Sequence, residues 1–130
     1  MSHSVNIKTQ FKNIHNLLQQ FTNSGWVIEY NTKCRTYPSD PRREEIHTYV
    51  AKNPVSSGYD VGIDVDADDN AYFVCDFFDS SIERQLGQNL QNIKQGYTLY
   101  EIQRQLDKEN FMYSVEELAT GEKVLTAYRD

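Results

Sequence analysis

The sequence predicts an α+β fold: an antiparallel sheet of hairpins, with an N-terminal β-α unit and two consecutive helices packed on one face. Three observations carry this prediction: short segments with apolar residues at every second position, longer segments with apolar residues at helical spacing, and a hairpin whose strands specify their own register. A chain of 130 residues can bury a core without disulfides or a structural metal. We therefore expect a single α+β domain over residues 1–130.

The β-α unit comes first. Apolar or β-branched residues alternate along the predicted strand, at Val5, Ile7, Thr9 and Phe11. The next segment places four apolar residues on one face of a helix, Ile14, Leu17, Leu18 and Phe21. Asn13 is a good capping residue, and Gly25 allows the left-handed backbone that often ends a helix, so we expect the helix to lie between them.

Two more strands are predicted over residues 26–30 (WVIEY) and 46–51 (IHTYVA). Pro38 and Pro41 interrupt the sequence between them, which predicts a loop over residues 38–43. Charges of both signs alternate in residues 40–45 (DPRREE), so we expect this part of the loop to be solvated.

The best-specified element is a hairpin in YDVGIDVDADDNAYFVCDFF, with a three-residue tip at residues 67–69. Its register places Val61 opposite Cys75 and Val65 opposite Ala71, so that one face is apolar throughout. The other face carries four aspartates, Asp60, Asp64, Asp66 and Asp76. A slip of one residue would bring Asp76 onto the apolar face, so burial selects this register.

The stretch DVDADDN around the tip resembles the first half of an EF-hand calcium loop. Such a loop needs a Gly at its sixth position and a bidentate Glu at its twelfth, where this chain has Asp69 and Cys75. We therefore interpret the stretch as a hairpin tip that turns in water. Asp69, the last tip residue, is expected to have a left-handed backbone.

Two helices are predicted after the hairpin. Ser80 with Glu83 resembles a capping box, and Gly96 is expected to end the first helix. The apolar stripe of that helix comprises Ile82, Leu86, Leu90 and Ile93. A second capping box, Thr98 with Glu101, predicts a further helix that ends before Asn110 and carries Leu99, Ile102 and Leu106 on its apolar face.

The tail predicts a closing hairpin that turns at Thr120 and Gly121. Its alternating residues are Phe111, Tyr113 and Val115 before the turn, and Val124, Thr126 and Tyr128 after it.

Charge and composition exclude several classes of protein. The net charge of −6 argues against a nucleic-acid partner, because such binding needs clustered Lys and Arg. The two cysteines, Cys34 and Cys75, have no metal-type or redox-type spacing and are expected to be reduced. Neither a signal peptide nor an apolar run of about 18 residues is present. We expect a soluble intracellular protein, at most peripheral on a membrane.

The chain resembles the hypothetical-chloroplast-reading-frame thirty-five (Ycf thirty-five) family of cyanobacteria and plastids. The resemblance rests on the opening SHSVNIKTQF, the helix ending in SGW, the YDVG strand, the helical IKQGYTLYEI and the two-strand tail. Two residues depart from the pattern. Members often have a bulky apolar residue in the place of Ser4 and a Gly in the place of Asp69. The resemblance implies a cyanobacterial cytosol or plastid stroma, peripheral thylakoid association, and an accessory role in photosystem I assembly, without an active site.

The residues themselves predict neither a metal nor a cofactor nor catalysis. Histidines and cysteines are present at His3, His15, His47, Cys34 and Cys75, but no pair has ligand spacing. His15 is expected on the wet side of its helix. Cys75 is expected to be a small buried hydrophobe, and Asp76 beside it would raise rather than lower its pKa.

We expect a non-enzymatic protein that acts by binding a protein partner. Its candidate partner-binding residues are Asp60, Asp64, Asp66 and Asp76, as an acidic strip for a basic partner, with Tyr97 and Tyr100 as an aromatic anchor. The aspartates could instead be only a solvated face, and the tyrosines could simply border the core. Two alternatives stay open: an adaptor or subunit of an AAA-type ATPase system, and a small metal-dependent or small-molecule enzyme.

Overall fold

The computed structural model describes residues 4–8 and 11–128. Its internal contacts divide the chain into two compact units, Met1–Ile93 and Lys94–Asp130, and each is described by itself. The expectation that residues 1–130 behave as a single domain stays a prediction. A single cooperative transition in calorimetry would support it.

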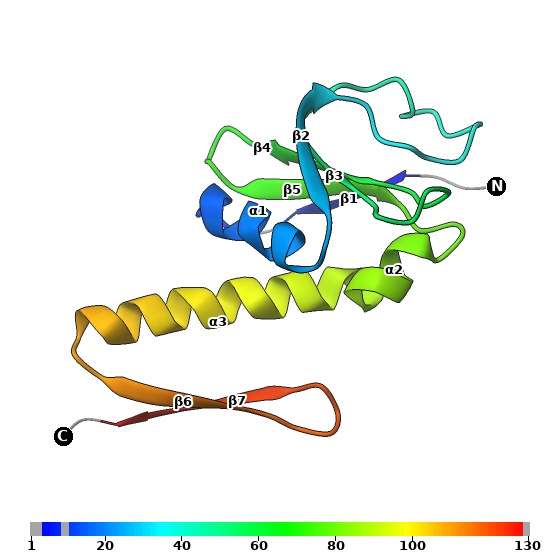
Figure 1. The fold of residues 1–130 in the computed structure, drawn as a ribbon. Coiled ribbons are helices and arrows are strands. Elements are labelled where there is room, and N and C mark those ends of the chain that lie inside the picture. Colours follow the sequence, from blue (N-terminus) through cyan, green and yellow to red (C-terminus); the bar gives the residue numbers. More distant parts are fainter. Residues whose placement is uncertain (1–3, 9–10, 129–130) are drawn as a thin grey trace. The chain divides into compact units, whose positions relative to one another are not determined.

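The first unit is built on a five-stranded antiparallel sheet with the order β1-β5-β4-β3-β2 (Figure 1). The strands are β1 (Ser4–Lys8), β2 (Val27–Thr32), β3 (His47–Lys52), β4 (Val61–Val65) and β5 (Ala71–Asp76). Helix α1 (Ile14–Asn23) follows β1, which confirms the β-α unit, while predicted strand residues 9–10 lie outside the described residues. The α+β class and the antiparallel sheet are confirmed.

Helix α1 covers one face of this sheet. The side chain of Asn13 accepts a hydrogen bond from the Asn16 amide at 3.3 Å, which confirms the predicted cap. Gly25 has the expected left-handed backbone just beyond the helix, with φ +87°. Phe21 is fully buried, and its ring lies 6.1 Å from that of Trp26 and 6.0 Å from that of Phe73, measured between centroids. These edge-on aromatic contacts join α1 to β5.

The hairpin of β4 and β5 has the register that its sequence predicts. Val61 lies opposite Cys75 and Val65 opposite Ala71. The backbone of Asp66 donates to Asn70 O at 2.9 Å, and Asp69 has φ +62°, so the left-handed tip residue is also confirmed. Cys75 is buried, as expected of a small hydrophobe on this face.

The connection between β2 and β3, residues 33–46, contains the loop predicted over residues 38–43. Its first part lies over the aspartate-bearing face of the sheet, where the Asp60 amide donates to Arg35 O at 3.0 Å and Cys34 is buried. Asp40 is also buried, so the expectation of a fully solvated stretch over residues 40–45 is wrong at its first residue. Both faces of the central strands are therefore covered.

The helices after β5 differ from the prediction in their boundaries. The first ends early, because Gly87 (φ +81°, ψ 166°) leaves the helix and Asn89 and Leu90 are left-handed. The segment consists of α2 (Ser81–Leu86), the short 3-10 helix η1 (Gln88–Leu90) and α3 (Gln91–Lys108). Gly96 lies inside α3 and does not end it, since a helical Gly costs only about 1 kcal/mol relative to Ala.

Neither predicted capping box forms. Ser80 is left-handed and its side chain makes no capping bond, while Thr98 is in the interior of α3. The side chain of Asp79 instead accepts from the Ser81 amide at 2.9 Å. The predicted apolar stripe is nevertheless correct, because all four of its residues are buried: Ile82, Leu86, Leu90 and Ile93.

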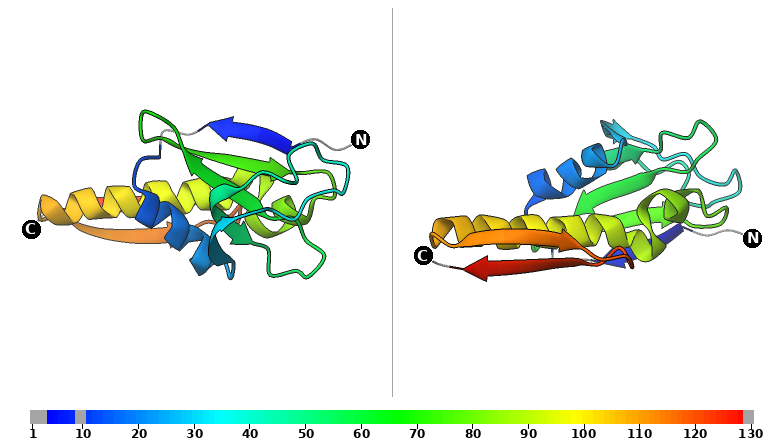
Figure 2. Two further views of the ribbon diagram at one scale, coloured as in Figure 1. Left: turned by 90° about the horizontal axis from the view of Figure 1, so that it is seen from above. Right: turned by 60° about the horizontal axis from the view of Figure 1, so that its bottom comes forward.

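The second unit contains most of α3 and a closing hairpin of β6 (Met112–Glu117) and β7 (Lys123–Tyr128) (Figure 2). The hairpin is confirmed, with Met112 opposite Tyr128 and Val115 opposite Leu125. Gly121 at its tip has φ +88°. This register puts the alternating sets predicted for the two strands on opposite faces, since Val115 and Val124 are not on the same side.

Candidate functional site

The four aspartates of the predicted acidic strip do not form an exposed surface. Asp60 and Asp76 are fully buried, and Asp64 is mostly covered. The expectation of a solvated docking strip is therefore wrong for Asp60 and Asp76, because the segment after β2 covers this face of the hairpin. Alternation of polar and apolar residues predicted the face correctly, but it could not show that the chain itself covers that face.

Asp60 is the centre of a buried ion-pair network. Its carboxylate accepts hydrogen bonds from the Arg35 amide at 2.7 Å, from the Arg35 guanidinium at 2.8–3.1 Å and from the Asn53 amide at 2.9 Å. Lys52 Nζ lies 3.4 Å away. Hydrogen bonding to Asp60 raises the pKa of Arg35. Because its oxygens are fully engaged, this carboxylate holds the fold together and is not free to act as an acid or base.

Arg35 extends the network to the turn after β3. Its guanidinium also donates to the carbonyl oxygens of Asn53 at 2.7 Å and Ser56 at 2.8 Å. One side chain thus joins the segment after β2, the turn after β3 and the start of β4. Sequence reasoning missed Arg35 and Asn53. An Arg placed in a long connection near an acidic strand was the signal that could have suggested a buried pair.

His47 forms a second, smaller cluster with Asp64. Its Nδ1 lies 2.8 Å from Asp64 Oδ2, and Asp64 Oδ1 accepts from the Thr48 amide at 2.8 Å. The buried imidazole lies directly against Gly62, where a Cβ would come within 2.7 Å of His47 Cγ. A His–Asp pair can move protons. Here, however, the pair joins β3 to β4. One oxygen of the Asp64 carboxylate contacts the His47 ring, and the other accepts from the Thr48 amide.

The two remaining aspartates also bind backbone amides. Asp66 Oδ1 accepts from the amides of Asp68 at 2.9 Å and Asn70 at 3.0 Å, which closes the hairpin tip. Asp76 accepts from the amides of Tyr37 at 3.1 Å and Phe78 at 3.0 Å. The four aspartates of the predicted strip are therefore brought to one face of one hairpin, where each accepts structural hydrogen bonds from the chain itself.

The cysteines and histidines do not converge. Cys34 and Cys75 are both buried and free, His15 is exposed as expected, and His3 lies outside the described residues. Burial, and then the nearby Asp60 charge, raise the pKa of the Cys34 thiol far above its ordinary value. Within residues 4–8 and 11–128, no three His, Cys, Asp or Glu side chains are grouped so that they could hold a metal ion.

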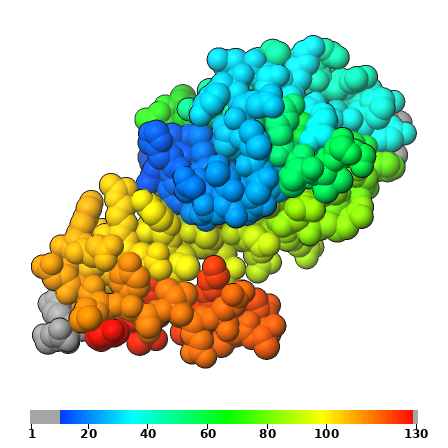
Figure 3. Space-filling model, in the orientation of Figure 1, coloured from blue at the N-terminus to red at the C-terminus, as the bar shows by residue number. Residues whose placement is uncertain are grey.

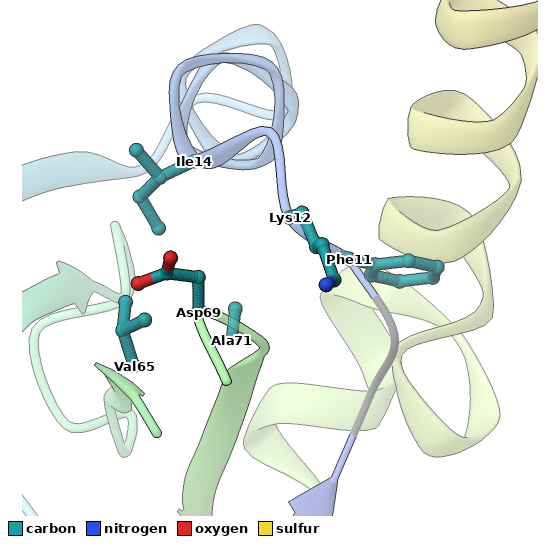
Figure 4. Close-up of a pocket in the computed structure, with 6 residues that line it drawn as sticks. All are labelled: Phe11, Lys12, Ile14, Val65, Asp69 and Ala71. Atoms are coloured by element: carbon teal, nitrogen blue, oxygen red, sulfur yellow. The ribbon is translucent and has the colours of Figure 1, made fainter. Parts of the chain in front are cut away.

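A shallow hollow of about 420 Å³ lies between the start of α1 and the tip of the β4–β5 hairpin (Figure 4). Its lining residues are Phe11, Lys12, Ile14, Val65, Asp69 and Ala71. The charged side chains, those of Lys12 and Asp69, are exposed, and the rest of the lining is mainly apolar. The hollow brings together neither a nucleophile and a base nor a set of buried polar groups that would orient a ligand.

The second unit differs from the first because it has almost no buried side chains. Among its described residues only Tyr97 is buried, so the predicted aromatic pair is not jointly accessible. Tyr97 agrees with the alternative that such tyrosines border a core, while Tyr100 is 47% exposed. The unit's exposed large apolar side chains are Tyr100, Ile102, Met112, Val115, Leu118, Val124 and Tyr128.

Three of these side chains share one side of the hairpin, which we call the exposed face. Directly opposite residues of an antiparallel pair project to the same side, so the register assigns six residues to it: Met112, Ser114, Glu116, Val124, Thr126 and Tyr128. All six are exposed, and in Figure 3 the orange and red atoms of the hairpin lie at the surface. The other side is partly covered, since Tyr113 and Leu125 are half-buried.

None of the helices in the described parts of the chain is long and apolar enough to cross a bilayer. In comparisons with known proteins, no family model, curated protein or solved structure matches the chain.

Proposed function

We propose that this protein is a non-enzymatic accessory factor that acts by binding another protein, and that the exposed face of its C-terminal hairpin is the binding surface. One observation carries the proposal: all six side chains of this face are exposed, and Met112, Val124 and Tyr128 each expose between 44% and 48% of their surface. Met112 lies directly opposite Tyr128, and Val124 lies on the same side beyond Ser114 and Thr126. Exposed apolar side chains that share one side of an element are typical of interaction sites.

The stability of the hairpin gives a physical reason for a partner. A two-stranded hairpin is at best marginally stable in water, and it gains stability when another structural element packs against an apolar face. A partner that buries Met112, Val124 and Tyr128 would remove apolar area from water at about 25 cal/mol per Å². The burial of Asp60 and the backbone bonds of Asp64 further support a non-enzymatic role, because they leave no free acid–base pair at the predicted strip.

Charges around the exposed face indicate the chemistry of the partner. Glu116 lies on the face and Glu122 is at the hairpin turn, and both are exposed. Apolar side chains with carboxylates beside them fit a partner that presents apolar side chains next to Lys or Arg, and complementary charge speeds encounter and sets specificity. The resemblance to the plastid family suggests assembly of photosystem I as the setting.

The experiment uses the full chain with a tag, expressed in the native cell, and identifies cross-linked partners by mass spectrometry. The test variant carries Met112→Thr, Val124→Thr and Tyr128→Thr, which remove the three large apolar side chains of the exposed face but keep residue types that suit a strand. The matched control carries Val27→Thr and Ile46→Thr, which remove two exposed apolar side chains of the first unit.

We expect the test variant to bind the identified partner at least tenfold more weakly, with the control unchanged. Far-ultraviolet circular dichroism confirms that both variants fold. Equal capture by the test variant, or equal loss by the two variants, would contradict the assignment of the exposed face.

A further inference from the structure

β7 has a backbone edge that is distinct from the exposed face of side chains. The two-stranded sheet has the order β6-β7, so among the described residues β7 has a strand neighbour on one side only. A strand edge of this kind presents unpaired N–H and C=O groups, which form a template for another strand.

The hairpin geometry shows which groups point to that edge. The Leu118 amide donates to Glu122 O at 2.8 Å, so this is a hydrogen-bonded pair next to the turn. Hydrogen-bonded and non-bonded pairs alternate along an antiparallel ladder, which makes Val124 with Glu116 bonded and Leu125 with Val115 non-bonded. The backbone groups of Lys123, Leu125 and Ala127 therefore point away from β6, toward the free edge.

Most of the usual protective devices are missing from the described residues of this edge. β7 has the sequence KVLTAY, with one charge, at its first residue, and no Pro. Its pairing with β6 is continuous, without a bulge, from Lys123 to Tyr128. The edge strand β2 of the larger sheet differs, because Asn31 is left-handed (φ +52°) and Thr32 rather than Asn31 continues its pairing with β3.

We propose that two copies of the chain associate through β7, edge to edge and antiparallel, into a four-stranded sheet with Leu125 on the two-fold axis. Only registers that place outward-pointing residues opposite one another form backbone hydrogen bonds. Among these, Leu125 opposite Leu125 is the register that pairs all three outward-pointing residues of β7, with Lys123 opposite Ala127 of the second copy. This register also forms a central row of four apolar side chains, because Val115 already lies opposite Leu125 within each hairpin.

Charge favours β7 over β6 as the contact edge. β6 carries Glu116 and Glu117, so pairing β6 with its own copy would bring Glu116 of the two chains to diagonal positions on one face. In the β7 register, Lys123 faces the small Ala127 and no like charges are opposite one another. Pairing β6 with β7 of another copy would not be two-fold and would leave free edges for further growth.

Sedimentation equilibrium of the full chain over a concentration series is the first measurement. Edge pairing of one six-residue strand buries less than the roughly 1,200–2,000 Å² of a standard interface, so we expect a dimer that dissociates on dilution. The mass should rise from 15.2 kDa toward twice that value and stop there. A monomer at about 1 mM, or a mass that keeps growing, would overturn the inference.

Two proline variants test which edge is used. Ala127→Pro removes an outward N–H that the β6–β7 ladder does not use, and Tyr113→Pro does the same on the free edge of β6, outside the central apolar row; edge strands tolerate Pro at such positions. We expect Ala127→Pro to raise the dimer dissociation constant at least tenfold and Tyr113→Pro to leave it nearly unchanged. The opposite result would overturn the assignment to β7.

Cysteine cross-linking tests the register without weakening the strand. Leu125→Cys should form an intermolecular disulfide under mild oxidation, because directly opposite Cα atoms lie about 5.5 Å apart, within disulfide range. Val115→Cys should not, since two strands separate the two copies of that residue, at about 4.8 Å for each strand spacing. Faster cross-linking of Val115→Cys than of Leu125→Cys would overturn the inference.

These results are separable from the test of the proposed function. A monomeric chain that still loses its cellular partner through the three exposed-face substitutions would overturn the dimer and support the proposed function. A dimer whose cellular partner is indifferent to those substitutions would support the dimer and contradict the proposed function.

Discussion

Asp60 and Arg35 form a buried ion pair that joins two segments far apart in the sequence. Arg35 Nη2 lies 2.8 Å from Asp60 Oδ1, the Arg35 amide lies 2.7 Å from Oδ2, and the carboxylate is fully buried. The start of β4 is thereby bound to the segment that follows β2. A carboxylate without water depends on these donors for its stability.

Asp60→Ala should therefore lower the free energy of unfolding by about 3 kcal/mol. Loss of one member of a buried pair typically costs about 3–5 kcal/mol, and the lower end applies because 37% of the Arg35 side chain reaches solvent. Urea denaturation measures the change. Asp68→Ala, at the exposed hairpin tip, is the matched control and should change stability by less than about 0.5 kcal/mol. Similar effects of both variants would contradict the structural role of Asp60.

Gly62→Ala should destabilise the protein by about 1–3 kcal/mol, the usual cost of overpacking a filled site. The added Cβ would lie 2.7 Å from His47 Cγ, and the buried imidazole is held by Asp64. A double-mutant cycle with His47→Ala tests the cause, because removing the ring should make Gly62→Ala much less costly. The same cost in both backgrounds would place the clash elsewhere.

Asp69→Gly should stabilise the fold by about 1 kcal/mol at most, because Gly relieves left-handed strain but adds freedom to the unfolded chain. Asp69 has φ +62°. The turn between β6 and β7 is closed by the same pattern of two backbone hydrogen bonds, and there the equivalent residue is Gly121. Asp68→Gly, whose backbone is not left-handed, is the control and should not stabilise. Chemical denaturation that shows a loss for Asp69→Gly would mean that its carboxylate supports the turn.

Cys34 should be unreactive toward a thiol reagent at about pH 8 in the native protein and reactive after unfolding. Burial raises its pKa above the ordinary value of 9.0, so the folded state keeps the thiol protonated. The contribution of this protonated thiol to stability is complete below pH 9. Above pH 9 the unfolded chain releases the proton while the folded chain keeps it, so the free energy of unfolding falls by up to about 1.4 kcal/mol per pH unit.

Cys34→Ala isolates this contribution from that of other groups that titrate at high pH, such as Tyr59 and Tyr72, whose pKa values are also raised by burial. Stability measured by denaturation between about pH 8 and pH 10.5 should fall less steeply for the variant. Parallel curves for the two proteins would contradict the prediction.

Calorimetry should show no saturable calcium binding at micromolar concentrations. Asp64 is bonded to His47 and to the Thr48 amide, and Asp66 Oδ1 accepts from two amides of the tip. With these carboxylates engaged, and without the Gly and bidentate Glu of an EF-hand, the stretch cannot close around the ion. A one-to-one isotherm at micromolar calcium would contradict this.

Much of the fold is determined locally, and the sequence therefore predicted it. The spacing of Leu17 and Phe21 specifies α1, and the alternation from Val61 to Cys75 specifies the register of the central hairpin. The closing hairpin was also predictable, because its strands flank Gly121. The helix boundary at Gly87 was not, because the apolar stripe continues through Leu90 although the backbone there is left-handed.

Only the tertiary structure decided which polar surfaces meet water. Asp60 and Asp76 alternate with apolar residues as solvated side chains do, yet Arg35 and the Tyr37 amide bind them from a connection about 25–40 residues earlier in the chain. The candidate site shows the opposite case. Val124 and Tyr128 belong to an alternating pattern that is typical of a buried face, yet both side chains are exposed. Periodicity in a sequence specifies which residues share a side, whereas burial depends on what the rest of the chain, or a partner, places against that side.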